Sequence, residues 1–215
     1  MANKSKPIPS LVKDPELVKI RRGQIIRAAV DLFVEKGFHK TTTREIARES
    51  GLGIGTLYEY IQSKEDVLYL VCDFIHSDVE QKLDELMTHG HTGRETLISA
   101  IRDLFRVMDD AQDHVLLIYQ EMKSLPSDML RYVLAKEEEI TSRFERILER
   151  GIQDGSLKLE PGSVKLMAHN IVVLGQMWTF RRWILSRHYT LEEYIEHQTS
   201  LILQGMTAVD EVSKK

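Results

Sequence analysis

The sequence is poor in cysteine, and it lacks any long apolar run. Its single cysteine, Cys72, cannot form a disulfide within the chain, which fits a reducing compartment. No apolar run approaches the length of about 18 residues that a membrane-spanning helix needs. The opening residues, MANKSKPIPS, lack the apolar segment of a secretory signal. We therefore expect a cytoplasmic protein.

Catalytic and metal-binding signatures are also missing. None of the eight histidines follows a glutamate by three residues, which is the spacing that di-iron helical bundles use. Asp73 and His76 have this spacing with an aspartate in place of the glutamate, and no second such pair accompanies them in the sequence. There is no Gly-x-Ser-x-Gly nucleophile turn and no phosphate-binding loop. His89 and His91 form the only close histidine pair. We therefore expect neither an enzyme nor a metal site, and we expect Cys72 to be a buried, inert thiol.

Charge is unevenly distributed along the 215 residues, whose net charge is −4. Residues 1–66 hold 12 of the 29 Lys and Arg but only 9 of the 33 Asp and Glu, so this part is mildly basic. The remaining residues then hold 17 Lys and Arg against 24 Asp and Glu. A basic module joined to an acidic body is compatible with binding to phosphate groups.

Helical spacing of apolar residues recurs along the chain, and no segment shows sustained strand alternation. We predict an all-α fold of about nine helices. Their expected ranges are 16–36, 43–51, 54–61, 64–87, 94–109, 112–124, 126–153, 162–186 and 191–209. We predict a flexible basic arm at 1–15, a helix-turn-helix DNA-binding domain at 16–66, and a helical bundle for ligand binding and dimerisation at 67–210.

The stretch TTTREIARESGLGIGTLYEYIQSKED, from Thr41 to Asp66, has the pattern of a helix, a tight turn and a short helix. Thr42 with Glu45 forms a capping box, and Gly51 suits a turn that needs a positive φ angle. Ala47 is small enough for a helix crossing, and Leu57 is placed to face inward. An ordinary helical hairpin is the plain alternative to a DNA-binding unit.

If the unit binds DNA, its short helix enters the major groove. Hydroxyl-bearing side chains there suit phosphates and base edges, and Gly55 allows the backbone to come close. The predicted DNA-binding residues are Thr42, Thr43, Arg44, Gly55, Thr56, Tyr58, Tyr60 and Lys64. Weaker, salt-sensitive contacts are expected from Lys4, Lys6, Lys13, Arg21 and Arg22.

This stretch, preceded by AAVDLFVEKGFHK, resembles the DNA-binding region of the tetracycline-repressor (TetR) family over residues 22–68. The matching elements are the Thr-Thr-x-x-Ile-Ala cap, the Gly-Thr-x-Tyr-x-Tyr helix and the Ser-Lys-Glu-Asp opening. The resemblance implies an all-α homodimer that binds a palindromic operator and is usually released by a small effector. Two departures are Ile61, where phenylalanine is usual, and Gly53-Ile54, where a polar pair is common, so the operator sequence is not predicted.

The last predicted helix carries an apolar face that suits either the core or a dimer interface. Its residues are Leu191, Tyr194, Ile195, Gln198, Leu201, Ile202, Gly205 and Met206. The family resemblance favours the dimer interface, because the last two helices of TetR proteins usually form a four-helix contact. A homodimer also supplies the two-fold symmetry that a palindrome requires.

The segment NIVVLGQMWTFRRWILSRHY places Arg181 and Arg182 one turn beyond Trp178. Arginine binds phosphate through a bidentate fork, and tryptophan stacks on flat bases. LIYQEMKSLP, WTFRRW and YTLEEY resemble a TetR subgroup that controls fatty-acid or related acyl-CoA degradation. This implies an acyl-CoA effector and no other cofactor. The proposed effector-binding residues are Tyr69, Leu104, Phe105, Met108, Tyr119, Leu174, Trp178, Arg181 and Arg182.

Other interpretations of these features remain open. The two arginines can be plain surface residues, and the tryptophans and the acyl-chain wall can be ordinary packing. The effector of a TetR-type regulator can also be an unrelated hydrophobic or aromatic ligand. An adaptor that binds protein instead of DNA is a further alternative, which salt dependence would separate from a DNA-binding regulator.

Overall fold

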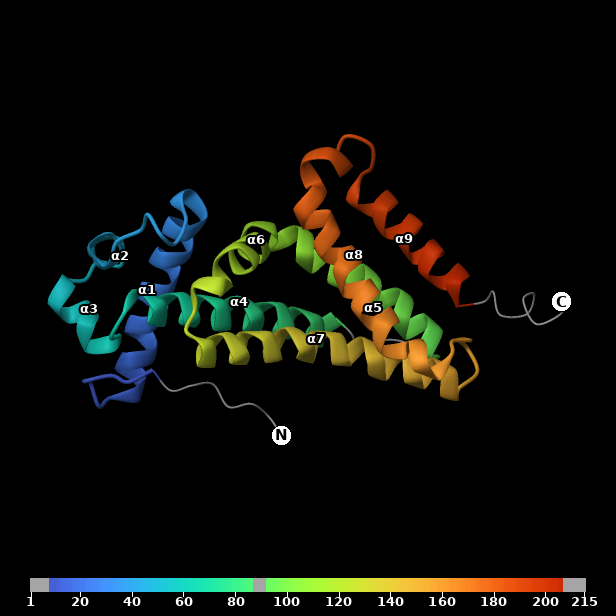
Figure 1. The fold of residues 1–215 in the computed structure, drawn as a ribbon, viewed down its shortest axis with the longest axis horizontal. Coiled ribbons are helices and arrows are strands. Elements are labelled where there is room, and N and C mark those ends of the chain that lie inside the picture. The colour runs from blue at the N-terminus through green and yellow to red at the C-terminus, as the bar shows by residue number, and fades with distance from the viewer. Residues whose placement is uncertain (1–7, 87–91, 207–215) are drawn as a thin grey trace. The chain divides into compact units, whose positions relative to one another are not determined.

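The structure is a computed structural model that describes residues 8–86 and 92–206. These residues form nine α-helices and two short 3-10 helices and contain no strand, which confirms the expected all-α fold (Figure 1). The α-helices are α1 (Pro15–Lys36), α2 (Thr43–Glu49), α3 (Ile54–Tyr60), α4 (Lys64–Leu86), α5 (Gly93–Asp110), α6 (Gln112–Glu121), α7 (Ser127–Gln153), α8 (Val164–Leu185) and α9 (Leu191–Gly205).

Most helix boundaries agree with the expected ranges to within two residues, and two helices, α6 and α9, end earlier than expected. Residues 112–124 were expected as one helix, but α6 ends at Glu121 and the 3-10 helix η1 (Met122–Ser124) follows. A second 3-10 helix, η2 (Pro161–Ser163), precedes α8. The helix expected at 191–209 ends at Gly205 with Met206 as its C-cap, and residues 207–209 lie outside the described range.

The chain divides into two compact units. Unit 1 comprises Met1–Ser77 and Asp113–Lys136, and unit 2 comprises Asp78–Gln112 and Glu137–Lys215. The dividing points lie within α4 and α7 and after the first residue of α6. The functional domains at 16–66 and 67–210 stay a prediction. Apolar side chains from the 113–136 segment, including Leu117 and Val133, join the same buried cluster as α1 to α4.

The helix-turn-helix of unit 1 is held by α1, whose ends carry clear signals. Asp14 caps its start by accepting hydrogen bonds from the backbone N–H groups of Glu16 at 3.0 Å and Leu17 at 3.3 Å. Gly37, with φ at +81°, ends it. Ile25 and Phe33 of α1 pack in the same cluster as Ile46 and Leu57 of the following two helices. This packing fixes α2 and α3 on a shared core.

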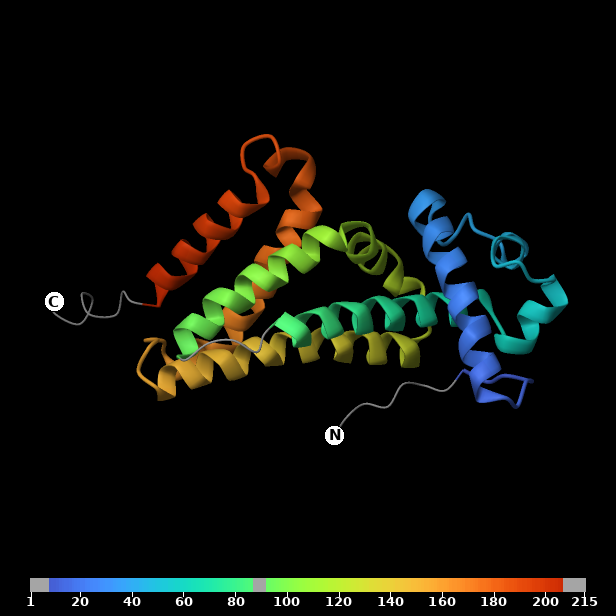
Figure 2. The same cartoon turned by 180° about the vertical axis from the view of Figure 1, so that it is seen from behind.

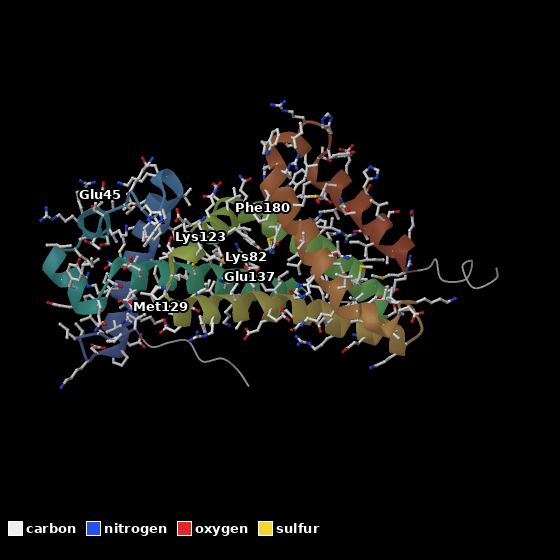
Figure 3. All side chains as sticks on the ribbon, viewed as in Figure 1. Glu45, Lys82, Lys123, Met129, Glu137 and Phe180 are labelled. Carbon is white, nitrogen blue, oxygen red and sulfur yellow. The ribbon has the colours of Figure 1, made fainter. Side chains whose placement is uncertain are left out.

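Unit 2 is built around α5, which packs against both α8 and α9, as the two opposite views show (Figures 1 and 2). Gly175 of α8 allows close approach, because a Cβ atom there would lie 3.1 Å from Cδ1 of Phe105 on α5. Glu137 of α7, which is labelled in Figure 3, accepts a hydrogen bond from the buried side-chain amide of Gln176 at 3.5 Å. Across the described helices, none has the length and apolar character needed to traverse a bilayer.

Candidate functional site

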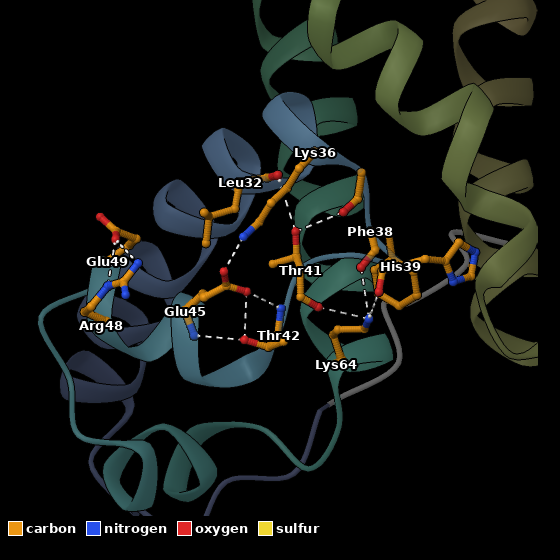
Figure 4. Close-up of polar contacts among 11 residues, drawn as sticks. Leu32, Lys36, Phe38, His39, Thr41, Thr42, Glu45, Arg48, Glu49 and Lys64 are labelled. Atoms are coloured by element: carbon orange, nitrogen blue, oxygen red, sulfur yellow. Dashed lines mark hydrogen bonds and ion pairs between the residues drawn. The ribbon is translucent and has the colours of Figure 1, made fainter.

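The start of α2 is fixed by a complete capping box, as the sequence predicted. The Glu45 carboxylate accepts hydrogen bonds from the backbone N–H and the hydroxyl of Thr42, both at 2.8 Å, and the Glu45 N–H donates back to Thr42 Oγ1 at 3.3 Å (Figure 4). Lys36 of α1 pairs with the same carboxylate. The hydrogen bond from Lys36 and those from Thr42 lower the pKa of Glu45 to about 2. Thr42 is thereby held in place while remaining exposed.

The turn between α2 and α3 takes the form expected of a helix-turn-helix. Gly51 has φ at +71°, in the left-handed region that favours glycine. The Leu52 N–H donates to the Ala47 carbonyl at 2.8 Å, which closes the turn. Ile46, Ala47 and Leu57 are buried at the crossing, which confirms the inward-facing positions read from the sequence.

The outer face of α3 presents an aliphatic and an aromatic side chain. Ile54 is 40% exposed and Tyr58 is 44% exposed, and Gly55 has open space where a side chain would be. The hydroxyls of Tyr58 and Thr43 lie 3.2 Å apart, so a hydrogen bond joins α3 to the start of α2. Arg44 is exposed and Thr56 is half-buried. The structure therefore brings six of the eight predicted DNA-binding residues to accessible positions on this unit.

Tyr60 and Lys64 have positions that the sequence did not predict. Tyr60 is only 3% exposed and belongs to the core cluster of unit 1, because it lies on the inward side of α3. Lys64 directs its ammonium group into the turn before α2, where it donates to the carbonyls of Phe38 at 2.9 Å and Thr41 at 3.1 Å (Figure 4). The same ammonium lies 4.2 Å from the centre of the Phe38 ring. Both side chains therefore make contacts within unit 1, whereas the sequence analysis predicted only contacts with DNA.

The predicted flexible arm is partly anchored, and Arg22 is its anchor. The Arg22 guanidinium donates to the carbonyl of Ile8 at 2.6 Å and to that of Tyr60 at 2.9 Å. The Leu11 N–H donates to the Glu59 carbonyl at 2.8 Å, and Ile8 is buried. Residues 8–14 are thus held against the end of α3. Arg22 makes internal contacts in place of the expected arm contact with DNA, and burial lowers its pKa.

Of the other expected arm contacts, Lys13 and Arg21 lie in the described part of the chain. Lys13 is exposed, and Arg21 donates to Gln24 Oε1 at 3.0 Å. Lys4 and Lys6 lie outside the described residues.

Polar contacts also join the 113–136 segment to the turn that precedes α2. Glu121 Oε1 accepts a hydrogen bond from the Phe38 N–H at 3.1 Å. Ser124 Oγ lies 3.3 Å from Nε2 of His39. Since Lys64 binds the carbonyls of the same turn, residues 37–41 are held from two directions. Glu121 lies within the LIYQEMKSLP stretch, but nothing in the sequence indicated its contact with Phe38.

In unit 2, Trp178 and Arg182 converge on one carboxylate. The Trp178 indole N–H donates to Asp109 Oδ1 at 2.7 Å, and Arg182 forms an ion pair with the same oxygen. The Arg182 guanidinium carbon lies 6.0 Å from the centre of the Trp178 ring. Arg181 differs from the prediction, because its guanidinium lies over the exposed ring of Trp183 at 5.5 Å. Only one of the two arginines therefore flanks Trp178.

A cleft of about 420 Å³ opens beside this carboxylate, at the turn from α8 to α9. It combines three basic or potentially basic side chains with aromatic and hydroxyl groups. Its lining residues are Asp109, Trp178, Arg182, Ser186, Arg187, His188, Tyr189, Thr190, Leu191 and Glu193. The sequence indicated Trp178 and Arg182 but missed Asp109, which is far from them along the chain.

The predicted walls for an acyl chain are divided between the units. Leu104, Phe105 and Met108 are buried in unit 2, and Leu174 is half-buried there. Tyr69 is buried in unit 1 beside Tyr132, with ring centres 5.4 Å apart. Tyr119 is also in unit 1 and partly exposed.

The predicted dimer face of α9 separates into an inner and an outer set. Tyr194, Ile195, Ile202 and Met206 are buried within unit 2, where the Tyr194 hydroxyl donates to the Leu174 carbonyl at 2.7 Å. Burial raises the pKa of this hydroxyl. On the outer set, Leu201 is 61% exposed, Gly205 is exposed, and Leu191 and Gln198 are half-buried.

Apolar side chains of α8 that the sequence analysis did not single out are also exposed. Val173 is 56% exposed, and Leu166 and Trp183 are exposed to a similar degree. Val173 and Leu166 are seven residues apart, which places them on one side of the helix. Exposed apolar side chains are therefore present on α8 as well as on α9.

The described residues contain no group of three or more histidine, cysteine, aspartate or glutamate side chains arranged to hold a metal ion. His89 and His91 lie outside them. Cys72 is buried and unbridged.

Comparison with known proteins identifies the family. Residues 25–69 match the model described as bacterial regulatory proteins of the tetR family, and residues 90–206 match the tetracyclin repressor-like C-terminal domain. The HTH-type transcriptional regulator HbdR of Aromatoleum sp. (strain CIB) is 33% identical, over 96% of this chain and 92% of its own length. The chain belongs to the TetR family of transcriptional regulators, and its relatives are regulators, not enzymes.

Solved structures share the fold. FadR from Bacillus subtilis in complex with stearoyl-CoA has a TM-score of 0.71 and 24% identity, with 85% of this chain and 98% of that chain covered. AibR in complex with isovaleryl coenzyme A and operator DNA also has a TM-score of 0.71, at 18% identity and with the same two coverages. At these identities the likeness establishes the architecture alone.

Proposed function

We propose that this regulator is a repressor that binds a palindromic operator as a homodimer and is released by a small effector, with a long-chain acyl-CoA as the leading candidate. The observation that carries the DNA-binding part is the α2–α3 unit. Its core and capping contacts fix the two helices, while hydroxyl and apolar side chains remain accessible on α3. We place its action in the cytoplasm.

The residues with roles in DNA binding follow from their exposure. Thr42, Thr43 and Arg44 bind the phosphate backbone beside the start of α2, and Gly55, Thr56 and Tyr58 of α3 enter the major groove. Tyr60 and Lys64 support this surface from within, and any phosphate contact by Lys64 must share its ammonium with the turn carbonyls.

The exposed apolar surface of α8 and α9 supports the proposed dimer. Val173, Leu201 and Leu166 are exposed and lie on the two helices that the family uses for dimerisation, and Val173 and Leu166 share one side of α8. In a two-fold symmetric dimer, this surface of one protomer would contact the same surface of the other protomer. The buried set of α9 then serves the unit 2 core, and the outer set serves the dimer.

The cleft beside Asp109 supports an effector with a phosphate-bearing head. Arg182 supplies a bidentate phosphate ligand, and the ring of Trp178 lies beside it. Because Arg182 is paired with Asp109, a bound phosphate must compete with that carboxylate. FadR and AibR, which share this fold, are each known as complexes with an acyl-CoA, which supports the same class of ligand.

Because Phe105 packs closely against Gly175, an acyl chain that enters among the predicted wall residues of unit 2 has to displace that ring. An effector that binds the displaced arrangement more tightly shifts the population of dimers away from the operator-bound form. A differential affinity of about 1–3 kcal/mol corresponds to a roughly 5–150-fold loss of DNA affinity.

The experiment is fluorescence anisotropy of a labelled fragment from upstream of this protein's gene, titrated with protein at two salt concentrations. We expect tight binding that weakens steeply with salt, and release by a long-chain acyl-CoA. Loss of salt dependence would favour a protein-binding adaptor. Binding that ignores acyl-CoA would favour the alternative of an unrelated hydrophobic or aromatic effector.

Two variants test the head-group site directly. Arg182→Gln should weaken acyl-CoA binding by about tenfold, since it removes one charge-assisted contact. Asp109→Asn should not weaken it, because this change removes the competing negative charge and retains an oxygen for the indole N–H. Equal affinities of both variants and the unmodified protein for acyl-CoA would place the phosphates elsewhere.

A further inference from the structure

Side-chain chemistry on α3 excludes the commonest ways of recognising a base. The helix reads IGTLYEY, so it contains no arginine, lysine, asparagine or glutamine. These are the residues that bind guanine or adenine through paired hydrogen bonds in the major groove. The groups that remain are two exposed hydrocarbon surfaces, the hydroxyls of Thr56 and Tyr58, and the Glu59 carboxylate.

Ile54 stands out among these groups, because it is a branched aliphatic side chain left 40% exposed. It lies one helical turn from Tyr58, which is exposed to a similar degree, whereas the neighbouring Leu57 is fully buried. The core of unit 1 is therefore complete without Ile54.

The residues beside Ile54 leave it accessible to a flat surface. Gly53 and Gly55 flank it, and neither has a side chain. A Cβ atom at Gly55 would meet nothing within 4 Å, and one at Gly53 would come no closer than 3.9 Å to Thr56 Oγ1. Neither glycine has a positive φ angle, so backbone conformation does not require them. Their effect is to clear space on both sides of one aliphatic side chain.

We propose that Ile54 contacts the 5-methyl group of a thymine in each operator half-site and so determines part of the operator sequence. This inference rests on the proposed function, because it needs the α2–α3 unit to bind duplex DNA. Thymine alone among the bases of DNA presents a methyl group in the major groove, and aliphatic side chains recognise it through apolar contact. Tyr58 differs from Ile54, since its hydroxyl is engaged with Thr43 at the start of α2.

The test removes only the methyl group. An operator is first obtained by selection from random duplexes with the full-length protein, and each thymine of the half-site is then replaced by deoxyuridine, symmetrically in both halves. At one position, replacing thymine by deoxyuridine should lower the affinity by about fourfold per half-site. This factor corresponds to the loss of one buried methyl-sized group. The other positions should change little.

The protein variants then assign that sensitivity. Ile54→Ala should bind thymine and deoxyuridine operators equally, whereas Ile54→Val should keep most of the discrimination. Ile20→Ala is the matched control, because Ile20 is an exposed isoleucine on α1 outside the proposed contact set. This variant should keep the full discrimination between thymine and deoxyuridine operators. Circular dichroism checks that each variant is folded.

Each result bears on a different proposal. Deoxyuridine without effect at every position, or discrimination that persists in Ile54→Ala, would overturn the role of Ile54 while the DNA-binding function stands. If selection recovers no bound duplex even at low salt, the proposed function fails and this inference fails with it.

Discussion

The α2–α3 region of unit 1 and the α8–α9 region of unit 2 use their polar and apolar side chains in opposite ways. Around α2 and α3, the cationic groups of Arg22 and Lys64 bind backbone carbonyls of the same unit. Along α8 and α9, large apolar side chains such as Val173 and Leu201 are exposed instead. The first region uses its cationic side chains for internal contacts and presents Ile54, Tyr58 and Glu59 on α3, and the second region presents large apolar side chains.

This difference teaches that residue type alone is a poor guide to which surface meets a partner. Lys64 belongs to a DNA-binding motif, yet its ammonium group binds backbone carbonyls within the fold. A valine in the middle of α8 is exposed although the helix as a whole packs against α5. Substitutions that reverse either arrangement should therefore have distinct effects on folding, dimerisation and DNA binding.

The largest effect is expected from a charge in the apolar surface of α8. Val173→Glu should raise the dimer dissociation constant by about 100-fold, because an unpaired carboxylate would be buried twice across a symmetric contact. Operator affinity should fall with it, since both half-sites then no longer bind together. Sedimentation velocity and anisotropy measure the two quantities on the same samples.

Leu134→Glu is the control for this change. Leu134 is an exposed leucine of α7 within unit 1, so the substitution adds the same charge outside the proposed interface. It should leave both constants within about twofold, as is usual for surface substitutions. Unchanged dimerisation in Val173→Glu would show that the dimer uses another face.

The second effect concerns the anchoring charges of unit 1. Arg22→Met keeps the apolar stem but removes the donor to the carbonyls of Ile8 and Tyr60. The free energy of unfolding should fall by about 2 kcal/mol, after allowance for the partial exposure of this group. Urea unfolding measures it. Arg21→Met, which loses only a contact with Gln24, should cost less, and equal costs would contradict the anchoring role.

How far the sequence predicts this molecule can be judged from the same two regions. The capping box at Thr42, the left-handed turn at Gly51 and the buried Leu57 were all predicted, because each depends on neighbours within a few residues. The number and order of the helices followed from apolar spacing. Of the α3 residues predicted to bind DNA, Gly55, Thr56 and Tyr58 are accessible and Tyr60 is buried.

The failures depend on contacts between distant residues. Asp109 pairs with Arg182 across 73 positions, and Glu121 binds the Phe38 N–H across 83. No local pattern reports such pairs. On α9, the sequence showed an apolar stripe but not which part of it faces α5, because a helix with a broad apolar face can bury either edge. Which residues of that stripe are buried depends on how α9 packs against the rest of unit 2, and the local sequence does not determine this.

A smaller effect is expected from the capping box when pH is lowered. The pKa of Glu45 is about 2 in the folded protein, below its ordinary value near 4.5. A depressed folded pKa contributes stability that is present above the unfolded pKa and is lost as pH falls from about 4.5 towards 2. Glu45→Gln should therefore be less stable than the unmodified protein at pH 6.

That difference should shrink as the pH decreases through this window. Urea midpoints at several pH values between 6 and 3 measure it, with Glu49→Gln as the control at an exposed glutamate of the same helix. A constant difference between Glu45→Gln and the unmodified protein would show that the charge of Glu45 makes no contribution.

The smallest effect is expected from the hydroxyl of Tyr58. This side chain is exposed on α3, and its hydroxyl makes one polar contact, with Thr43 at the start of α2. Tyr58→Phe removes the hydrogen bond to Thr43 and one donor for a phosphate. Operator affinity should fall by about two- to tenfold, the range for one hydrogen bond, while the unfolding free energy changes by less than about 1 kcal/mol. Tyr189→Phe, an exposed tyrosine in unit 2, should leave operator affinity unchanged. If Tyr58→Phe lowers stability and affinity by the same free energy, the hydroxyl acts by positioning α2, and a direct contact of this hydroxyl with DNA is wrong.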